Sequence, residues 1–94
     1  MYLTNEQFDK LRSWAQHTSQ IEEAYLFGSY AKGEADGGSD VDVAIKASAS
    51  NWADLIATWQ KQLTQQLGVR VSIRTLANPK IRKYCHAYGV RLKR

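Results

Sequence analysis

The sequence of 94 residues has one cysteine, one proline and no long apolar run. The single Cys85 excludes a disulfide within the chain and fits a reducing cytoplasm, where we expect the thiol to be a small core or surface residue. The apolar runs are short and interrupted by charge, so we expect no membrane span. Residues 1–23 are polar and lack the apolar segment of a signal peptide. The chain is therefore expected to be a single cytoplasmic domain, residues 1–94.

Acidic residues are missing from the C-terminal part of the chain. Residues 1–54 contain all nine acids and four bases, whereas residues 55–94 contain nine bases and no acid. Such a one-signed stretch is usually a solvated face, and the alternative is a surface for a triphosphate, a nucleic acid or an acidic protein. We do not expect nucleic-acid binding, because no recognition motif accompanies the basic residues. These are Arg70, Arg74, Lys80, Arg82, Lys83, Arg91, Lys93 and Arg94.

Helical signals mark three segments. Thr4-Asn5-Glu6-Gln7 has the pattern of a capping box and predicts a helix that fades at about His17 to Ser19. Apolar residues at helical spacing predict a long helix from Ser50 to Leu67. Asn78-Pro79 predicts the cap and first residue of a last helix. The residues of the last two helices that we expect to face inward are Trp52, Trp59, Ile81, Tyr84, Cys85 and Tyr88.

Strand signals alternate with these helices. Ala24 to Phe27 is an apolar run typical of a buried strand, while Asp40 to Lys46 and Val69 to Arg74 alternate between polar and apolar residues. Val90 to Lys93 fits a terminal edge strand. The order of helices and strands predicts an α/β (α+β) fold.

Two carboxylates lie close together on the second of these strands. Strand periodicity puts Asp40 and Asp42 on one face, about 6–7 Å apart along the chain. Carboxylates that close repel each other unless a cation lies between them or one is protonated. Magnesium prefers hard oxygen ligands, so a carboxylate pair suits it, although Asp-x-Asp alone is also common on exposed edge strands.

A Gly-Ser turn precedes the carboxylate pair. Gly28 follows the first strand and permits a sharp turn with close approach of backbone amides to a ligand. Ser29 then begins a short helical turn whose free N–H groups are able to bind an anion. Taken alone, Gly-Ser after a strand is only a turn.

Together these segments resemble the nucleotidyltransferase superfamily typified by DNA polymerase β, in particular its minimal, single-domain bacterial members. The matching residues run from Leu26 to Gly33 (LFGSYAKG) and from Ser39 to Ile45 (SDVDVAI). The resemblance implies a nucleotidyltransferase-like fold, a small mixed β-sheet of three to four strands flanked by helices. It also implies that Asp40 and Asp42 are catalytic and ligate up to two Mg²⁺ ions. The residues expected to bind the triphosphate of ATP or another nucleotide are Gly28, Ser29, Lys32 and Ser39.

The sequence departs from the family pattern at one position. Members usually carry a third acid on the strand after the long helix, and here Ser72 stands in that place between Arg70 and Arg74. Serine is a poor metal ligand and a poor base at neutral pH. The two arginines are able to pair with the aspartates, to hold the triphosphate or to face solvent.

Two functions follow from the resemblance. The first is a metal-dependent nucleotidyltransferase that transfers a nucleoside monophosphate from a nucleoside triphosphate, ATP foremost, to a hydroxyl. The minimal members often act as antitoxins of small helical HEPN-type partners, so the resemblance implies such a partner as acceptor, with a homodimer as the other assembly. The second is a catalytically degenerate domain that binds nucleotide or partner without efficient transfer, which the serine at position 72 favours.

Overall fold

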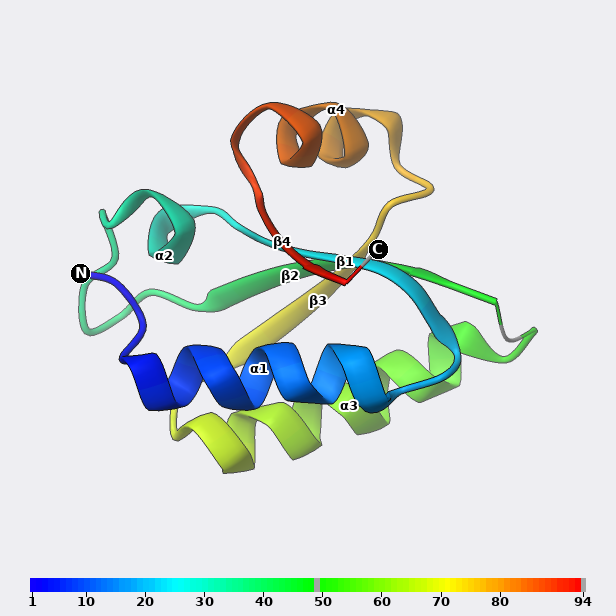
Figure 1. Cartoon of the computed structure of the whole chain (residues 1–94), viewed down its shortest axis with the longest axis horizontal. Coiled ribbons are helices and arrows are strands. Elements are labelled where there is room, and N and C mark those ends of the chain that lie inside the picture. Colours follow the sequence, from blue (N-terminus) through cyan, green and yellow to red (C-terminus); the bar gives the residue numbers. More distant parts are fainter. Residues whose placement is uncertain (49, 94) are drawn as a thin grey trace.

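The computed structural model describes residues 1–48 and 50–93. Within these ranges the chain forms four helices and four strands, and the figures use their labels (Figure 1). In chain order they are α1 (Asn5–His17), β1 (Ile21–Phe27), α2 (Ser29–Lys32), β2 (Val41–Ala47), α3 (Trp52–Leu67), β3 (Val71–Thr75), α4 (Pro79–Tyr88) and β4 (Val90–Lys93). Arg94, one of the basic residues noted above, lies outside the described residues.

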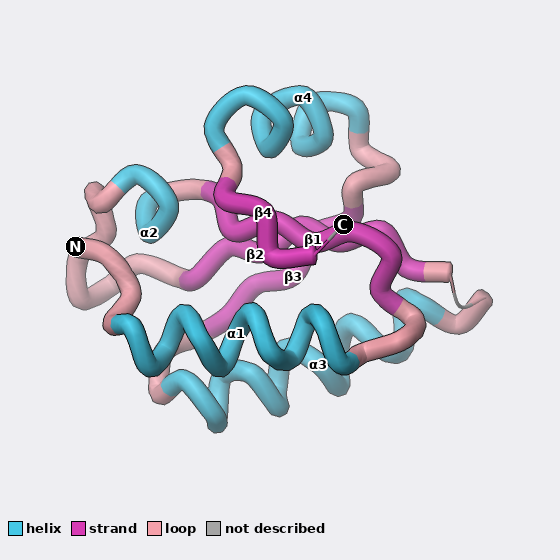
Figure 2. The backbone as a smooth tube through the Cα atoms, in the orientation of Figure 1, coloured by secondary structure: helices cyan, strands magenta, loops and turns pink. Residues whose placement is uncertain are grey.

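The strands form one mixed sheet in the order β3-β2-β1-β4. Strand β1 is antiparallel to β2 and β4, whereas β2 is parallel to β3. Helices α1 and α3 cover one face of the sheet and α4 covers the other, while α2 lies at the end of the sheet where β1 finishes (Figures 1 and 2). The predicted fold class, a small mixed sheet flanked by helices, is confirmed.

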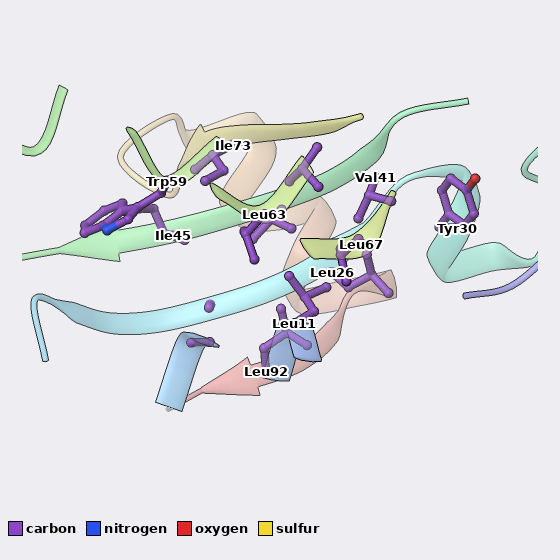
Figure 3. Packing of buried hydrophobic residues seen from close by; sticks show 14 of the residues in the cluster. Leu11, Leu26, Tyr30, Val41, Ile45, Trp59, Leu63, Leu67, Ile73 and Leu92 are labelled. Atoms are coloured by element: carbon purple, nitrogen blue, oxygen red, sulfur yellow. The ribbon is translucent and has the colours of Figure 1, made fainter. Parts of the chain in front are cut away.

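The main core lies between the sheet and helices α1 and α3. Alternation along β2 sends Val41, Val43 and Ile45 into this core, where each is at most 1% exposed. Figure 3 shows Tyr30 at one end of the core and Trp59 at the other. Burial of each large aliphatic side chain contributes about 1.5–3 kcal/mol, so this layer fixes the position of β2.

The opposite face of the sheet carries a smaller cluster beneath α4. Tyr25, Ala44, Leu76 and Cys85 are buried there, and Phe27 packs against them. Burial raises the pKa of the Cys85 thiol and keeps it protonated. Since side chains alternate along β2, the face that carries Ala44 also carries Asp42.

Strand β3 forms one outer edge of the sheet, and side chains of α3 cover its outward amides. The Val71 amide donates to Thr64 Oγ1 at 3.0 Å, and the Ile73 amide donates to Gln60 Oε1 at 2.7 Å. These bonds satisfy backbone donors that an edge strand would otherwise leave open.

The local end signals of the helices were predicted correctly. Thr4 and Gln7 form both hydrogen bonds of a capping box, and the Asn78 side chain accepts from the amides at the start of α4. Two inward assignments were wrong. Trp52 is 40% exposed because it lies in the first turn of α3, ahead of the buried stripe, and Tyr88 is 64% exposed because it ends α4 and packs beside Tyr84.

Several predicted boundaries move by a few residues. Strand β1 begins at Ile21 rather than Ala24, β2 at Val41 rather than Asp40, and β3 at Val71 rather than Val69. Pairing explains the start of β2, because the Val41 amide donates at 2.8 Å to the carbonyl of Arg70, the residue just before β3. Across residues 1–48 and 50–93, no helix combines the length and the apolar character that a membrane crossing requires.

Candidate active site

The two aspartates lie at the beginning of β2. Asp42 is the second residue of the strand, and Asp40 directly precedes it. The pKa of Asp42 is raised, first by burial and then by the negative charge of Asp40, with Arg74 acting in the opposite direction. The structure therefore brings the two acids within electrostatic reach of each other in a partly desolvated place.

The Gly28 turn packs directly against one of these acids. Phe27, the last residue of β1, pairs with Asp42 across the antiparallel ladder. Gly28 follows with φ 78° and ψ −154°, and a Cβ built on it overlaps the Asp42 Oδ2 atom. Only glycine fits here, both because of its backbone conformation and because the carboxylate takes the space of a side chain.

Helix α2 continues from this turn. Ser29 is its first residue, and the amides of Ala31 and Lys32 donate to the Gly28 carbonyl at 3.1 and 3.2 Å. Tyr30 is 6% exposed and inserts into the main core, which anchors the helix to the sheet. The first two amides of the helix, those of Ser29 and Tyr30, lack acceptors within it, and they follow the turn that packs against Asp42.

The structure also locates Ser72, which stands where the family resemblance implies a third acid. Ser72 on β3 is the direct register partner of Asp42 in the parallel pair, so the two side chains share a face. Arg70 Nε lies 4.0 Å from Asp40 Oδ1, and their side chains are 80% and 39% exposed. Arg74 pairs with Ala44 one step further along the strand. The sequence left three arrangements open for the arginines: pairing with the aspartates, binding of the triphosphate or exposure to solvent. In the structure Arg70 lies beside Asp40.

Two other residues expected at the site make contacts of their own. The Lys32 ammonium lies 5.4 Å from the ring centroid of Tyr84 and 5.6 Å from that of Tyr88. Its pKa is raised chiefly by the Tyr84 hydroxyl. The Ser39 hydroxyl accepts from the Asp36 amide at 2.9 Å and lies 3.3 Å from Asp36 Oδ1, which closes the loop before β2.

Asp40 and Arg70 border two surface hollows. One, of about 570 Å³, is also lined by Tyr2, Tyr30 and the Gly37–Ser39 loop. The other, of about 560 Å³, lies towards α3 and is also lined by Ser72 and by polar residues of that helix, Gln60, Lys61, Thr64 and Gln65. Asp40 is therefore accessible from two sides, whereas Asp42 lines neither hollow.

A profile of the family described as "Polymerase beta, Nucleotidyltransferase" matches residues 9–92. The chain belongs to this family. No curated protein sequence matches it significantly. The match includes the Gly-Ser turn, both aspartates and Ser72, so the residues brought together above lie inside the nucleotidyltransferase domain.

Solved structures of toxin–antitoxin complexes have the same fold. A chain from a toxin–antitoxin complex crystallised with AMP-PNP is 24% identical, with a TM-score of 0.71 over 95% of this chain and 73% of that one. A chain of the MntA–HepT complex is 19% identical, with a TM-score of 0.68 over 95% and 71% of the two chains. A third, from a complex of MNT antitoxin with tri-AMPylated HEPN toxin of Shewanella oneidensis, is 21% identical, with a TM-score of 0.66 over 92% and 68%.

No sequence pattern indicated that two distant segments, the N-terminus and α4, contact the Gly-Ser segment of this nucleotidyltransferase domain. The Tyr2 ring occupies the place of a side chain at Gly33, and the Met1 amino group donates to the Gly33 carbonyl. Tyr84 approaches the same segment from α4. Helical spacing indicated only that Tyr84 faces inward, and no local pattern connects residues so far apart in the chain.

Proposed function

We propose that the protein is a metal-dependent nucleotidyltransferase that transfers a nucleoside monophosphate from a nucleoside triphosphate, ATP foremost, to a hydroxyl of a protein partner. The observation that carries the proposal is that the Asp42 carboxylate occupies the space of a side chain at Gly28. A turn suited to phosphate oxygens and a pair of carboxylates are thereby joined in one place. Family membership supplies the class of reaction.

The acid pair fits a divalent cation in its chemistry. Asp40 and Asp42 provide hard carboxylate oxygens, and the raised pKa of Asp42 reflects negative charge that burial leaves poorly compensated. Among residues 1–48 and 50–93 no group of three or more His, Cys, Asp or Glu side chains has an arrangement that could hold a metal ion. Mg²⁺ held here would therefore depend on these two carboxylates together with nucleotide phosphates and water. Bound Mg²⁺ supplies charge compensation for the attacking and leaving oxygens.

Other residues of the chain are assigned to phosphate binding and to removal of the proton from the acceptor hydroxyl. We assign donation to the phosphate oxygens to the amides of Ser29 and Tyr30 and to the Ser29 hydroxyl, with Lys32 at the other end of α2. The guanidinium of Arg70 is exposed and free to turn from Asp40 to a phosphate, since a surface ion pair contributes little. The Ser72 hydroxyl does not accept a proton as a carboxylate does, so the acceptor hydroxyl loses its proton to water or Asp42.

The partner proposed as acceptor is a small HEPN-type protein. The support is the fold shared with chains of toxin–antitoxin complexes, one of which contains a tri-AMPylated HEPN toxin. A second copy of the chain remains the alternative assembly.

The test is an incubation of the protein with Mg²⁺, a HEPN-type protein encoded beside it, and ATP labelled at the α-phosphate. Label should appear on the partner, and ATP labelled at the γ-phosphate should leave none, because transfer of a monophosphate releases pyrophosphate. The variant Asp40→Asn/Asp42→Asn is the matched control and should transfer nothing. Absence of label with every nucleoside triphosphate would contradict the proposal.

A degenerate binding domain is the second function, favoured by Ser72 in the register position of Asp42 and by the approach of Arg70 to Asp40. Calorimetry of the partner complex separates the two. Full partner affinity in the double aspartate variant, with no transfer by the unmodified protein, supports binding without chemistry.

A further inference from the structure

Helix α2 is too short to be stable without contacts from the rest of the protein. It has four residues, Ser29–Lys32, and isolated helices well beyond this length are marginal in water. Its flanking residues Gly28 and Gly33 both have positive φ angles (78° and 76°), the conformation that glycine allows most freely. Contacts from other elements must therefore keep the segment from Phe27 to Lys32 in place.

Two of these contacts involve the rings of Tyr30 and Tyr2. The buried Tyr30 ring anchors the middle of α2 in the main core. The Tyr2 ring packs against Gly33, just beyond the helix. Neither contact reaches Phe27 or the Lys32 side chain, which lie at the two ends of the segment.

Tyr84 contacts both of those ends. Its ring meets the Phe27 ring edge-on, with centroids 6.1 Å apart and an interplanar angle of 68°. The Lys32 ammonium lies over the same ring, 5.4 Å from its centroid. Phe27 directly precedes Gly28, and Lys32 is the last residue of α2. A single side chain of α4 thus contacts both the residue before Gly28 and the last residue of α2.

We propose that Tyr84 is a positioning residue of the nucleotide site, which holds the Gly28–Ser29 turn and the Lys32 side chain in the arrangement that receives the triphosphate. The inference rests on the proposed function. Tyr84 acts through Phe27 and Lys32, with no contact to the reacting atoms required. Its contribution is to reduce the motion that the turn must lose when nucleotide binds.

Tyr88 provides an internal comparison. It lies one helical turn further along α4, with its ring 5.3 Å from that of Tyr84 and 5.6 Å from the Lys32 ammonium. Among the described residues its ring contacts Lys32 and Tyr84 but not Phe27, and it is 64% exposed. Removal of Tyr88 should therefore loosen Lys32 and leave the start of the turn unchanged. His86 is a control on the same helix, since its ring packs on Tyr25 (5.7 Å).

The experiment compares the variants Tyr84→Ala, Tyr84→Phe, Tyr88→Ala and His86→Ala with the unmodified protein. Binding of α,β-methylene ATP with Mg²⁺ is measured by calorimetry, because this analogue does not undergo transfer. Hydrogen exchange of the amides of residues 28–33 is measured without nucleotide. Where Tyr84→Ala does not fold, Tyr84→Leu replaces it, since leucine keeps apolar bulk against Phe27 but offers Lys32 no aromatic face.

Tyr84→Ala should weaken nucleotide binding about fivefold to tenfold, given the usual strength of aromatic and cation–π contacts. It should also speed exchange of the 28–33 amides, while the amides of α1 and α3 keep their rates. Tyr84→Phe should restore the exchange rates and most of the affinity, because both ring contacts remain and only the interaction of the hydroxyl with Lys32 is lost. Tyr88→Ala should weaken binding about twofold and His86→Ala not at all.

The outcomes are distinguishable. If the unmodified protein does not bind the analogue, the proposed function fails and the role of Tyr84 fails with it. If the unmodified protein binds but Tyr84→Ala binds equally well, or exchanges the 28–33 amides at unchanged rates, only the role of Tyr84 is overturned. Equal losses in Tyr84→Ala and His86→Ala would assign the effect to α4 as a whole and also overturn it.

Discussion

Ser72 lies directly across from Asp42 in the parallel pairing of β2 and β3, on the same face of the sheet. A serine hydroxyl thus stands where the family resemblance implies a third carboxylate. Because the two residues are paired, a single substitution at position 72 puts a carboxylate beside Asp42 without change to the backbone.

Ser72→Asp should raise the rate of nucleotide transfer at least about tenfold, because a lost metal ligand or base commonly costs this much or more. The comparison is Ser72→Asn, which has nearly the same size and no charge. Transfer assays with α-labelled ATP provide the rates. An equal response to both substitutions would show that a carboxylate is not what the site lacks.

Gly28→Ala should abolish nucleotide binding and lower the free energy of unfolding by about 1–3 kcal/mol. The added methyl group meets Asp42 Oδ2, and the backbone at this position has a φ angle of 78°. Gly37→Ala is the matched control. A Cβ there has no neighbour within 4 Å, so its effect should stay within about 0.5 kcal/mol. Chemical denaturation and calorimetry of nucleotide binding measure both properties.

Asp42→Asn should raise the melting temperature by a few degrees at pH 7 in the presence of EDTA. The folded pKa of Asp42 is raised above the ordinary value of 3.8 by burial and by Asp40. The folded state therefore binds a proton more readily than the unfolded state, and stability falls as the pH rises through this window.

The difference between variant and parent should shrink towards pH 3, where the carboxyl is protonated in both states. Thermal melts from pH 3 to 7 check this, with Asp9→Asn on the exposed side of α1 as the control for the substitution itself. A variant less stable than the parent at pH 7 would contradict the cause assigned to the shift.

Arg70→Gln should leave stability within about 0.5 kcal/mol, because its contact with Asp40 is long and solvent-exposed. Nucleotide affinity should fall about threefold to tenfold if the guanidinium turns to a phosphate, as the proposed function requires. Tighter Mg²⁺ binding with unchanged nucleotide affinity would instead mean that Arg70 competes with the cation for Asp40.

The sequence predicted those elements whose signals are local. The capping box at Thr4, the Asn78-Pro79 start of α4 and the alternation around Asp42 all depend on residues a few positions apart. The nearness of the turn to the acids was implied by the family motif, and the pairing of Phe27 with Asp42 shows how the sheet produces it.

Contacts between distant segments were not predictable in this way. The contact of Lys32 with Tyr84 joins α2 to α4, and no periodicity within either helix indicates it. Trp52 follows the same helical spacing as Trp59, yet only Trp59 reaches the sheet, because burial depends on where the helix meets its neighbours. Such outcomes are set by tertiary packing rather than by local pattern.

The bonds from Thr64 and Gln60 to the outer side of β3 restrict how this molecule can associate. An incoming chain that tried to extend the sheet there would first have to displace two satisfied donors. Extension of the sheet by a second chain at the β3 edge is therefore disfavoured. We expect a protein partner to bind at the helices or at β4 instead.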